Sequence, residues 1–486
     1  MGERIKARGQ YIAGKWEYNG KTRPIYSPWD GRIVGETTVT SVVDAERAIA
    51  AAARSFAHTR ALTTAERHDI LRAIHDGIAA RREEFACCIV DEAGKPLRDA
   101  RFEVDRALLV FSLAAEEARR PRGDVLPLDL NPASAGRIGL TQRFPAGPVA
   151  AISPFNFPLN LVAHKVAPAF ATGCPVVLKP AEKTPLTALL LAEVIAGTGW
   201  PSEAFSVLTP ADPHVVGTML ATDPRLPVLS FTGSDKVGWH LKSLANRKRV
   251  ILELGGNAAV IVHGDADQAY AAARCAVGAF AYAGQVCISV QRIFVQRRIH
   301  EEWTERFLTH VAKLRFGDPA DETTEIGPLI SDSAKSKISA WVGEAVAGGA
   351  RCLAGEQSVS GGNRMRPVVL THTRPDMAVR QEEVFGPVVV VEPYDSFEEA
   401  IELANDSRFG LQAGIFTRDI GRLFRAWSEL EVGGVVANDV PQFRIDNMPY
   451  GGEKESGFGR EGVRYAIEEM TQPRLLALNF SPEEAS

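Results

Sequence analysis

Several features are scarce in this sequence, and each absence excludes a class of protein. Six cysteines among 486 residues are too few for a disulfide-stapled scaffold, and no metal-type Cys-x-x-Cys pair occurs. The formal net charge of -5 leaves no basic excess that would favour nucleic acid as a partner. No apolar run approaches the length of a membrane span, so no membrane partner is expected. The composition therefore predicts reduced thiols and no metal centre.

The N-terminus carries no recognisable targeting signal. Residues 1–10 alternate charged and small residues without an apolar segment, which argues against a secretory signal. Lys6 stands where a myristoylation signal needs serine or threonine. Together with the cysteine usage, these features predict a cytoplasmic location.

Length and residue pattern predict two or three domains. Residues 43–120 have a helical pattern, in which Thr63 and Glu66 show capping-box spacing before an apolar-periodic run. Gly94-Lys95-Pro96 is expected to end one of these helices. Residues 121–145 contain several prolines and two short extended pieces. They are either an ordinary surface hairpin or an oligomer contact.

Strands and helices alternate from about residue 148 onward. This pattern predicts a parallel sheet with helices on both faces, and such sheets bind ligands beyond the carboxyl ends of their strands. Asn156, Lys179, Ser234 and Glu253 each follow a predicted strand, so we expect them at that edge. A second α/β segment follows, and a final strand-like run has no evident partner. These segments are 149–153, 175–179, 205–208, 228–231 and 250–253 for the first sheet, 258–440 for the second, and 474–480 for the run.

One cysteine stands in a setting that favours chemistry. Cys287 lies among small and apolar residues just after Gly284, and it follows a segment, 275–283, that is expected to be a closely packed helix. Upstream, Glu253 precedes the pair Gly255-Gly256, and packing does not explain a carboxylate there. A cysteine nucleophile with a glutamate base suits acyl chemistry. The alternative is that Cys287 is a small buried hydrophobe, the commoner role of a lone cysteine.

A glycine-containing turn suggests a nucleotide site. Thr232-Gly233-Ser234 opens a helix after a strand, and free N–H groups at a helix start can bind phosphate. The pattern is not G-x-G-x-x-G, so a plain tight turn is the alternative. Lys179 and Glu182 follow the neighbouring strand. A carboxylate there accepts hydrogen bonds from both ribose hydroxyls and repels a 2′-phosphate, which favours NAD over NADP.

Asn156 is a candidate donor to an oxyanion. It lies between aromatic residues and prolines in Pro154-Phe-Asn-Phe-Pro158, and proline restricts the local chain. A carboxamide held in one direction is what an oxyanion requires. The alternative is an ordinary turn asparagine.

Taken together, these motifs closely resemble the NAD(P)-dependent aldehyde dehydrogenase superfamily over nearly the whole chain. Two departures, Phe155 where many members carry tryptophan and Asn257 where many carry lysine, do not affect catalytic positions. The phrases 288–292 and 443–446 look most like the lactaldehyde and small polar aldehyde branch. The matching pieces are Pro154-Phe-Asn-Phe-Pro158, Lys179-Pro-Ala-Glu-Lys-Thr-Pro185, Phe231-Thr-Gly-Ser234, Glu253-Leu-Gly-Gly256, Gly284-Gln-Val-Cys287, Glu382-Glu-Val-Phe-Gly-Pro387, Pro449-Tyr-Gly-Gly452 and Ser456-Gly-Phe-Gly459.

The resemblance implies a role for each site residue. Cys287 would be the nucleophile, Asn156 and the Cys287 backbone N–H would form the oxyanion hole, and Glu253 would activate water. Lys179 and Glu182 would hold the adenosine ribose, and Ser234 would meet the pyrophosphate. The remaining residues implied in cofactor binding are Ile152, Ser153, Gly233, Gly238, Leu254, Glu383 and Phe385, the last two at the nicotinamide ribose and ring.

The resemblance also implies a fold. This is an α/β architecture of the aldehyde dehydrogenase type, with two α/β domains that contain parallel-rich sheets and a small β arm for oligomerisation. A homodimer or a homotetramer would follow. The implied limits are 1–120 and 146–254 for the Rossmann-like cofactor domain, 255–467 for the catalytic domain, and 121–145 with 468–486 for the arm.

The implied reaction is NAD-dependent oxidation of an aldehyde to an acid through a cysteine thiohemiacetal and a thioester. A coenzyme A-acylating enzyme is one alternative, but that branch tends to lack the glutamate that Glu253 matches. A non-catalytic structural or binding protein on the same fold is another. Loss of the cysteine or the glutamate would favour it, and both are present.

The substrate is expected to be a small polar aldehyde such as lactaldehyde or a semialdehyde. Val286 and Ile288 flank the nucleophile and make its surroundings apolar. Arg106 and Arg444 are expected near the substrate tunnel, where two converging arginines would favour an anionic group. The alternative is that either arginine makes a structural ion pair.

Overall fold

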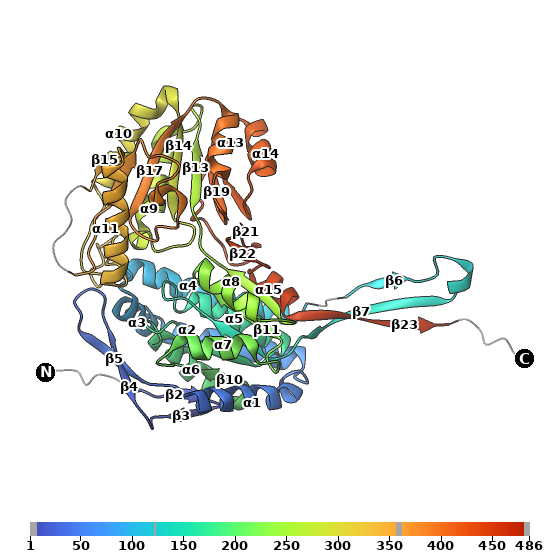
Figure 1. Ribbon diagram of the computed structural model, residues 1–486. Coiled ribbons are helices and arrows are strands. Elements are labelled where there is room, and N and C mark those ends of the chain that lie inside the picture. Colours follow the sequence, from blue (N-terminus) through green and yellow to red (C-terminus); the bar gives the residue numbers. More distant parts are fainter. Residues whose placement is uncertain (1–6, 121–122, 356–361, 481–486) are drawn as a thin grey trace, which may run out of the picture.

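The computed structural model describes residues 7–120, 123–355 and 362–480. The prediction of no secretory signal falls partly on residues 1–6, which lie outside these ranges. Two α/β bodies pack together, and a long β arm projects from one of them (Figure 1). This confirms the predicted α/β class with parallel-rich sheets. No helix in the described ranges is long and apolar enough to cross a membrane, and no cluster of potential metal ligands occurs in them.

The first body is built on an eight-stranded sheet with a parallel centre. Its central strands pair in the order β12-β11-β8-β9-β10, and antiparallel strands close both edges. All five strands predicted for this sheet are present, within one residue of their expected limits. Across the sheet the strands are β22 (Gly457–Phe458), β12 (Arg249–Glu253), β11 (Val228–Thr232), β8 (Val149–Ile152), β9 (Val176–Lys179), β10 (Phe205–Val207), β2 (Gln10–Ile12) and β3 (Lys15–Glu17).

Helices cover both faces of this sheet because alternate strand residues point to opposite sides. Ala151 and Leu178 contribute to one apolar cluster with α2 to α6, whereas Ala150 and Val177 contribute to another with α1, α7 and α8. The expected capping box at Thr63 and Glu66 starts α2. The helices are α1 (Val42–Thr59), α2 (Thr64–Ala80), α3 (Arg82–Ala93), α4 (Leu97–Ala118), α5 (Asn160–Thr172), α6 (Leu186–Ala196), α7 (Pro213–Thr222) and α8 (Asp235–Leu244).

The second body contains a seven-stranded sheet that is parallel except at β15. Its order is β15-β16-β17-β14-β13-β19-β20, and helices again lie on both faces. The strands are β13 (Ala258–Val262), β14 (Val290–Gln296), β15 (Arg351–Ala354), β16 (Val368–Thr371), β17 (Val388–Tyr394), β19 (Gln412–Phe416) and β20 (Gly434–Ala437). The helices are α9 (Gln268–Phe280), α10 (His300–Val311), α11 (Asp332–Ala347), α12 (Ala378–Gln381), α13 (Phe397–Asn405) and α14 (Ile420–Glu429).

Smaller elements complete the chain. The C-terminal run expected to be a strand is β23, and it pairs antiparallel with β7 along its whole length to form the arm with β6 (Figure 1). These elements are β1 (Ala7–Arg8), β4 (Thr22–Tyr26), β5 (Ile33–Thr38), β6 (Val125–Pro127), β7 (Arg137–Pro145), β18 (Phe409–Gly410), β21 (Glu453–Lys454), α15 (Val463–Glu469) and β23 (Thr471–Asn479).

The helix expected over residues 275–283 is wrong at its end. Helix α9 stops at Phe280, and Tyr282, Ala283 and Gly284 have φ angles of 50°, 53° and 69°. Three successive left-handed residues cannot continue a right-handed helix. The chain therefore turns sharply just before Cys287.

Candidate active site

The predicted edge residues lie where the first sheet changes its winding direction. From β8 the chain builds outward through β9 and β10, whereas β11 and β12 lie on the other side of β8. Such a switch leaves a crevice beyond the carboxyl ends of the strands. Ile152 and Thr232 end the two strands that flank it, and Ser153 follows Ile152 with its backbone N–H donated to Lys179 O.

Cys287 lies in a short loop between α9 and β14, and its thiol contacts Tyr450. The Sγ atom is 3.0 Å from the Tyr450 hydroxyl. Gly284 allows the preceding turn, because a Cβ there would lie 2.2 Å from the Gly386 carbonyl oxygen. Burial raises the pKa of Cys287 to about 11, although the Tyr450 hydrogen bond and Arg444 oppose the rise. The thiol therefore keeps its proton at neutral pH in the described state.

The Asn156 carboxamide is buried and linked to the Cys287 loop. Its Nδ2 donates to the carbonyl of Gln285 over 2.9 Å. Gln285 is itself fixed, because its side chain donates to Pro328 O and accepts from the Ile330 N–H. The structure thus brings together the two predicted segments that contain Asn156 and Cys287.

Glu253 ends β12 as a buried carboxylate. Among the described residues neither of its oxygens has a hydrogen-bond partner, and the side chain is 3% exposed. Burial raises the pKa of Glu253 well above the ordinary value, and the negative charge of Glu461 raises it further. Glu253 also contributes to the raised pKa of Cys287, so its charge reaches the thiol.

Sequence reasoning missed the polar network behind Glu253. Lys165 donates to Glu461 over 3.1 Å and to Thr232 over 2.7 Å, and all three side chains are buried. Burial would raise the pKa of Glu461, but Lys165, His164 and Arg444 hold it at about 2. One signal was available, because Lys165 is a lone lysine in an otherwise apolar helix.

The two candidate substrate arginines converge, but each already has an acidic partner. Arg106 binds Asp446 with both Nε and Nη2, at 3.1 and 2.5 Å. Arg444 donates to Glu461 over 3.2 Å, and its guanidinium lies 3.6 Å from the centre of the Tyr450 ring. Asp446 also contacts His164, which is 3.3 Å from Arg444. These contacts place both arginines in one buried network beside Tyr450, the neighbour of the Cys287 thiol.

The predicted phosphate turn has the required form. Ser234 is the N-cap of α8, and its side chain makes no capping hydrogen bond. A Cβ at Gly238 would lie 2.3 Å from Leu254, and one at Gly233 would lie 2.7 Å from the Phe231 ring. Glycine at both positions therefore leaves room for the Leu254 and Phe231 side chains against the start of α8.

Lys179 and Glu182 lie together at the end of β9. Their Nζ and Oε1 atoms are 2.5 Å apart. Burial alone would raise the pKa of Glu182, but Lys179 lowers it overall, so the carboxylate is ionised. An ionised carboxylate beside an ammonium is a plausible ribose-binding pair.

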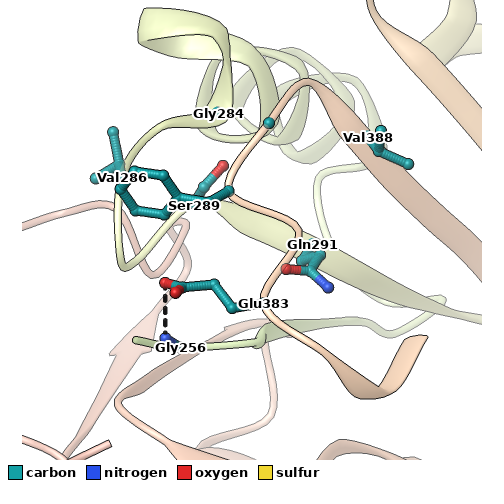
Figure 2. A pocket seen from close by; sticks show the side chains of 9 residues that line it. Gly256, Gly284, Val286, Ser289, Gln291, Glu383 and Val388 are labelled. Atoms are coloured by element: carbon teal, nitrogen blue, oxygen red, sulfur yellow. Dashed lines mark hydrogen bonds between the residues drawn. The ribbon is translucent and has the colours of Figure 1, made fainter. Parts of the chain in front are cut away.

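Glu383 and Phe385 line a small cavity in the second body. Glu383 accepts the Gly256 N–H over 3.0 Å, and Figure 2 shows its carboxylate directed at Gly256. Burial raises the pKa of Glu383 to about 7, although this hydrogen bond lowers it. Phe385 has a φ of 53°. The cavity is lined by Gly256, Gly284, Val286, Ser289, Gln291, Glu383, Phe385, Gly386 and Val388.

The apolar neighbours of the nucleophile differ in where they lie. Val286 lines the cavity of Figure 2 and is 7% exposed. Ile288 is 4% exposed, and both side chains belong to the apolar cluster against which Cys287 packs. The immediate surroundings of Cys287 are therefore apolar, as its flanking residues predict.

Comparison with known proteins assigns this arrangement to a family. The model of the aldehyde dehydrogenase family matches residues 16–476. The chain is 42% identical over 477 residues to the 3-sulfolactaldehyde dehydrogenase of Priestia aryabhattai, which covers 98% of this chain and 99% of that protein. It is 36% identical over 477 residues to the lactaldehyde dehydrogenase of Methanococcus vannielii, with coverage of 96% and 99%.

Solved structures agree closely with the fold. Aldehyde dehydrogenase 21 from Physcomitrella patens, in complex with its reaction product succinate, has a TM-score of 0.96 at 40% identity and covers 99% and 100% of the two chains. The glyceraldehyde-3-phosphate dehydrogenase of Methanocaldococcus jannaschii, complexed with NADP, has a TM-score of 0.90 at 37% identity, with coverage of 95% and 100%. The betaine aldehyde dehydrogenase of Staphylococcus aureus, in complex with NAD+, has a TM-score of 0.93 at 34% identity, with coverage of 98% and 96%.

Proposed function

The chain belongs to the aldehyde dehydrogenase family, and from this premise we propose that it oxidises a small polar aldehyde to the acid with NAD as the hydride acceptor. Its relatives include enzymes named for lactaldehyde, sulfolactaldehyde and aspartate semialdehyde. We assign Cys287 as the nucleophile, Asn156 as the oxyanion donor and Glu253 as the base. We further propose a cytoplasmic homo-oligomer.

One observation carries the hydrolytic form of this proposal. Glu253 is a buried carboxylate whose oxygens have no hydrogen-bond partner among the described residues, and its pKa is raised. A structural buried carboxylate is normally paired. An unpaired one with an elevated pKa is suited to take a proton from a neighbouring water or thiol.

The first half of the reaction uses Cys287 and Asn156. Glu253 takes the proton of the Cys287 thiol and passes it to solvent, the sulfur bonds to the aldehyde carbon, and the carbonyl oxygen becomes an oxyanion. The Asn156 amide has two N–H groups, of which one is donated to Gln285 O and the other is free to stabilise that oxyanion. When bound, NAD supplies the acceptor for the hydride that leaves the same carbon.

The second half of the reaction uses Glu253. The carbon is now a thioester on Cys287, and Glu253 takes a proton from water so that the hydroxide adds to the carbonyl. The C–S bond then breaks, the acid departs, and the Cys287 sulfur recovers a proton. The Lys165–Glu461 pair behind Glu253 keeps its environment polar without neutralising it directly.

The residues at the carboxyl edge fit a dinucleotide. The N-terminus of α8 with the uncommitted Ser234 hydroxyl suits a pyrophosphate, and the ionised Glu182 beside Lys179 suits the hydroxyls of an adenosine ribose. Ile152, Ser153 and Leu254 would form the floor of this site. Glu383 and Phe385 would meet the nicotinamide end. Because Glu182 would repel a 2′-phosphate, we propose NAD in preference to NADP.

For the substrate we propose an anionic group. Arg106, Arg444 and His164 converge beside Tyr450, with Asp446 between them. The succinate-bound neighbour and the sulfolactaldehyde enzyme act on compounds that contain such a group. The apolar Val286 and Ile288 would pack against the short carbon chain.

NADH formation at 340 nm tests the function directly. The purified protein is assayed with lactaldehyde, succinic semialdehyde, glyceraldehyde and a medium-chain alkanal, each with NAD and with NADP. We expect the highest kcat/KM with an anionic aldehyde and NAD, and no turnover by Cys287→Ala. Turnover with NADP alone would overturn the Glu182 argument, and no turnover with any aldehyde would favour a non-catalytic role.

Coenzyme A acylation is the second candidate, and the same assay separates it. An acylating enzyme needs coenzyme A to release the acyl group, whereas a hydrolytic enzyme turns over in water alone. We expect added coenzyme A to leave the NADH rate and the acid product unchanged.

A further inference from the structure

A buried ion pair lies outside the residues assigned above and touches both reacting segments. Lys95 lies between α3 and α4, directly before Pro96, and Glu103 lies on α4 about two turns after that proline. Their side chains form a salt bridge and are 1% and 0% exposed. Desolvation makes such a pair expensive, and an apolar pair of the same volume is often as stable. This cost indicates that the Lys95–Glu103 pair has a role beyond stability.

Glu103 fixes the segment that contains Asn156. Its Oε1 accepts the backbone N–H groups of Leu159 and Asn160, over 2.9 and 3.1 Å. These are the first N–H groups of α5, which starts directly after Pro154-Phe-Asn-Phe-Pro158. No side chain of that loop caps α5. A carboxylate from another helix thus sets where the Asn156 loop ends.

Lys95 contacts the same loop and the nucleophile segment together. Its Nζ lies 3.5 Å from the centre of the Phe157 ring and 4.7 Å from that of Tyr282. The two rings also meet edge to face, with centroids 6.5 Å apart. Phe157 is the neighbour of Asn156, and Tyr282 begins the left-handed turn that leads to Cys287.

Tyr282 has a second contact with the segment that joins α3 to α4. Its hydroxyl donates to the carbonyl of Ala93, the last residue of α3, over 2.9 Å. The left-handed backbone at Tyr282 costs energy for a residue with a side chain, so surrounding contacts must hold it. Ala93 and Lys95, where the chain passes from α3 to α4, supply those contacts to the turn at Tyr282.

We propose that Lys95 and Glu103 are positioning residues, which hold the Asn156 carboxamide in register with Cys287. The inference rests on the proposed function, because it assigns the pair an effect on the oxyanion step. The 2.9 Å bond between Asn156 and Gln285 O is the point where the two held segments meet. Small displacements at an oxyanion donor cost on the order of 100-fold in rate.

The test compares Glu103 with a second buried carboxylate that also caps the start of a helix. Glu92 is 0% exposed and accepts the first two N–H groups of α6, Leu186 and Thr187, over 2.7 and 2.9 Å. It therefore matches Glu103 in burial and in capping, yet its hydrogen bonds within the described residues go to the start of α6 and not to the Asn156 or Cys287 segment. The variants are Glu92→Gln and Lys95→Met/Glu103→Gln, the latter chosen so that no buried charge is left unpaired.

For the double variant we expect kcat and kcat/KM for the aldehyde to fall together by about 10–100-fold, the signature of a lost transition-state contact. The KM for the cofactor should stay constant, and a deuterated aldehyde should show a larger isotope effect than with the parent enzyme. Rates are expressed per folded protein, so loss of folded protein does not enter. Glu92→Gln should lose thermal stability only.

Equal per-site rates in the double variant and Glu92→Gln would overturn the inference. If the double variant does not fold, Phe157→Leu removes the ring from Lys95 and should lower kcat in the same direction by a smaller factor.

Hydrogen exchange separates this inference from the proposed function. We expect faster exchange in peptides that cover 155–161 and 282–288 even if no aldehyde is turned over, and unchanged exchange there would also overturn it.

Discussion

The surroundings of Cys287 hold its thiol in the protonated form. The residue is half-buried, and desolvation raises the pKa of the thiol to about 11, so that almost all of it is protonated at neutral pH. The reactive form is the thiolate. A base must therefore remove the proton during turnover, and we propose Glu253, whose negative charge reaches the thiol, for this step as well.

The first prediction concerns Glu253→Gln. Steady-state turnover should fall by about 100- to 10,000-fold, because the variant cannot take a proton from water. A single but slower burst of NADH per site should remain, since sulfur addition and hydride transfer precede hydrolysis and the thiol can still lose its proton to solvent. The burst rate should rise with pH towards about 11, as the thiolate fraction of Cys287 increases.

Stopped-flow absorbance at 340 nm over a pH series measures both phases. Cys287→Ala is the control and should show neither burst nor turnover. Normal hydrolysis by Glu253→Gln would remove the glutamate from the mechanism and reopen the coenzyme A alternative.

The second prediction concerns the charge of the substrate. Arg106→Gln should raise the KM for succinic semialdehyde by about 10-fold or more and leave that for a neutral aldehyde unchanged, because a charge-assisted hydrogen bond contributes about 1.5–3 kcal/mol. Arg101→Gln is a matched control on the same helix, where Arg101 pairs with the surface acids Glu83 and Glu322. An equal change for both aldehydes would make the Arg106–Asp446 contact purely structural.

The residues that sequence could identify are those in contiguous motifs. Cys287, Glu253 and Asn156 each lie in a short stretch whose residue types are hard to explain by packing. Lys165 and Glu461 do not, because they meet only through the fold, and the lone lysine of α5 does not reveal its partner in the sequence.

At the scale of elements, strands were easier to predict than turns. The parallel strands are short apolar runs bounded by glycine and proline, and such runs have few alternatives. The end of α9 was missed, because Tyr282 and Ala283 adopt left-handed φ angles without the glycine signal that usually marks them. Contacts from α3 and α4, distant in sequence, hold that turn in place.

The third prediction concerns the cap of α6. Burial raises the pKa of Glu92 from 4.5 to about 7, although the bonds from Thr187 and Leu186 lower it. The folded chain therefore binds this proton more tightly than the unfolded chain. The resulting stability is fully present below about pH 4.5 and is lost as the pH rises through about 7.

Thermal melts of the parent chain and Glu92→Gln across pH 4.5–8 check this. The Tm of the parent relative to that of the variant should fall as the pH rises through this window. The free energy of unfolding changes by at most about 1.4 kcal/mol per pH unit. A difference in Tm that is constant with pH would show that Glu92 does not titrate there.

At the scale of the whole molecule, contacts within one chain do not explain the exposed apolar surface of the arm. Figure 1 shows β6, β7 and β23 extending away from both bodies. Leu475 and Leu476 are 57% and 56% exposed although neighbouring strand residues face opposite sides, so both faces of the arm present apolar surface. Exposed apolar surface of this kind marks an interaction site.

The fourth prediction is that this arm holds copies of the chain together. Leu475→Glu/Leu476→Glu should shift the assembly to monomers, because each buried leucine contributes about 1.5–3 kcal/mol per site and a buried charge opposes docking. Val43→Glu is the control, since Val43 is 69% exposed and lies on α1, which is not part of the arm. Sedimentation velocity over a range of protein concentrations measures the outcome. The exposed leucines would not have this role if the parent chain is already monomeric, or if the double variant forms the same oligomer as the parent. Monomers in the double variant alone would assign the interface to β23.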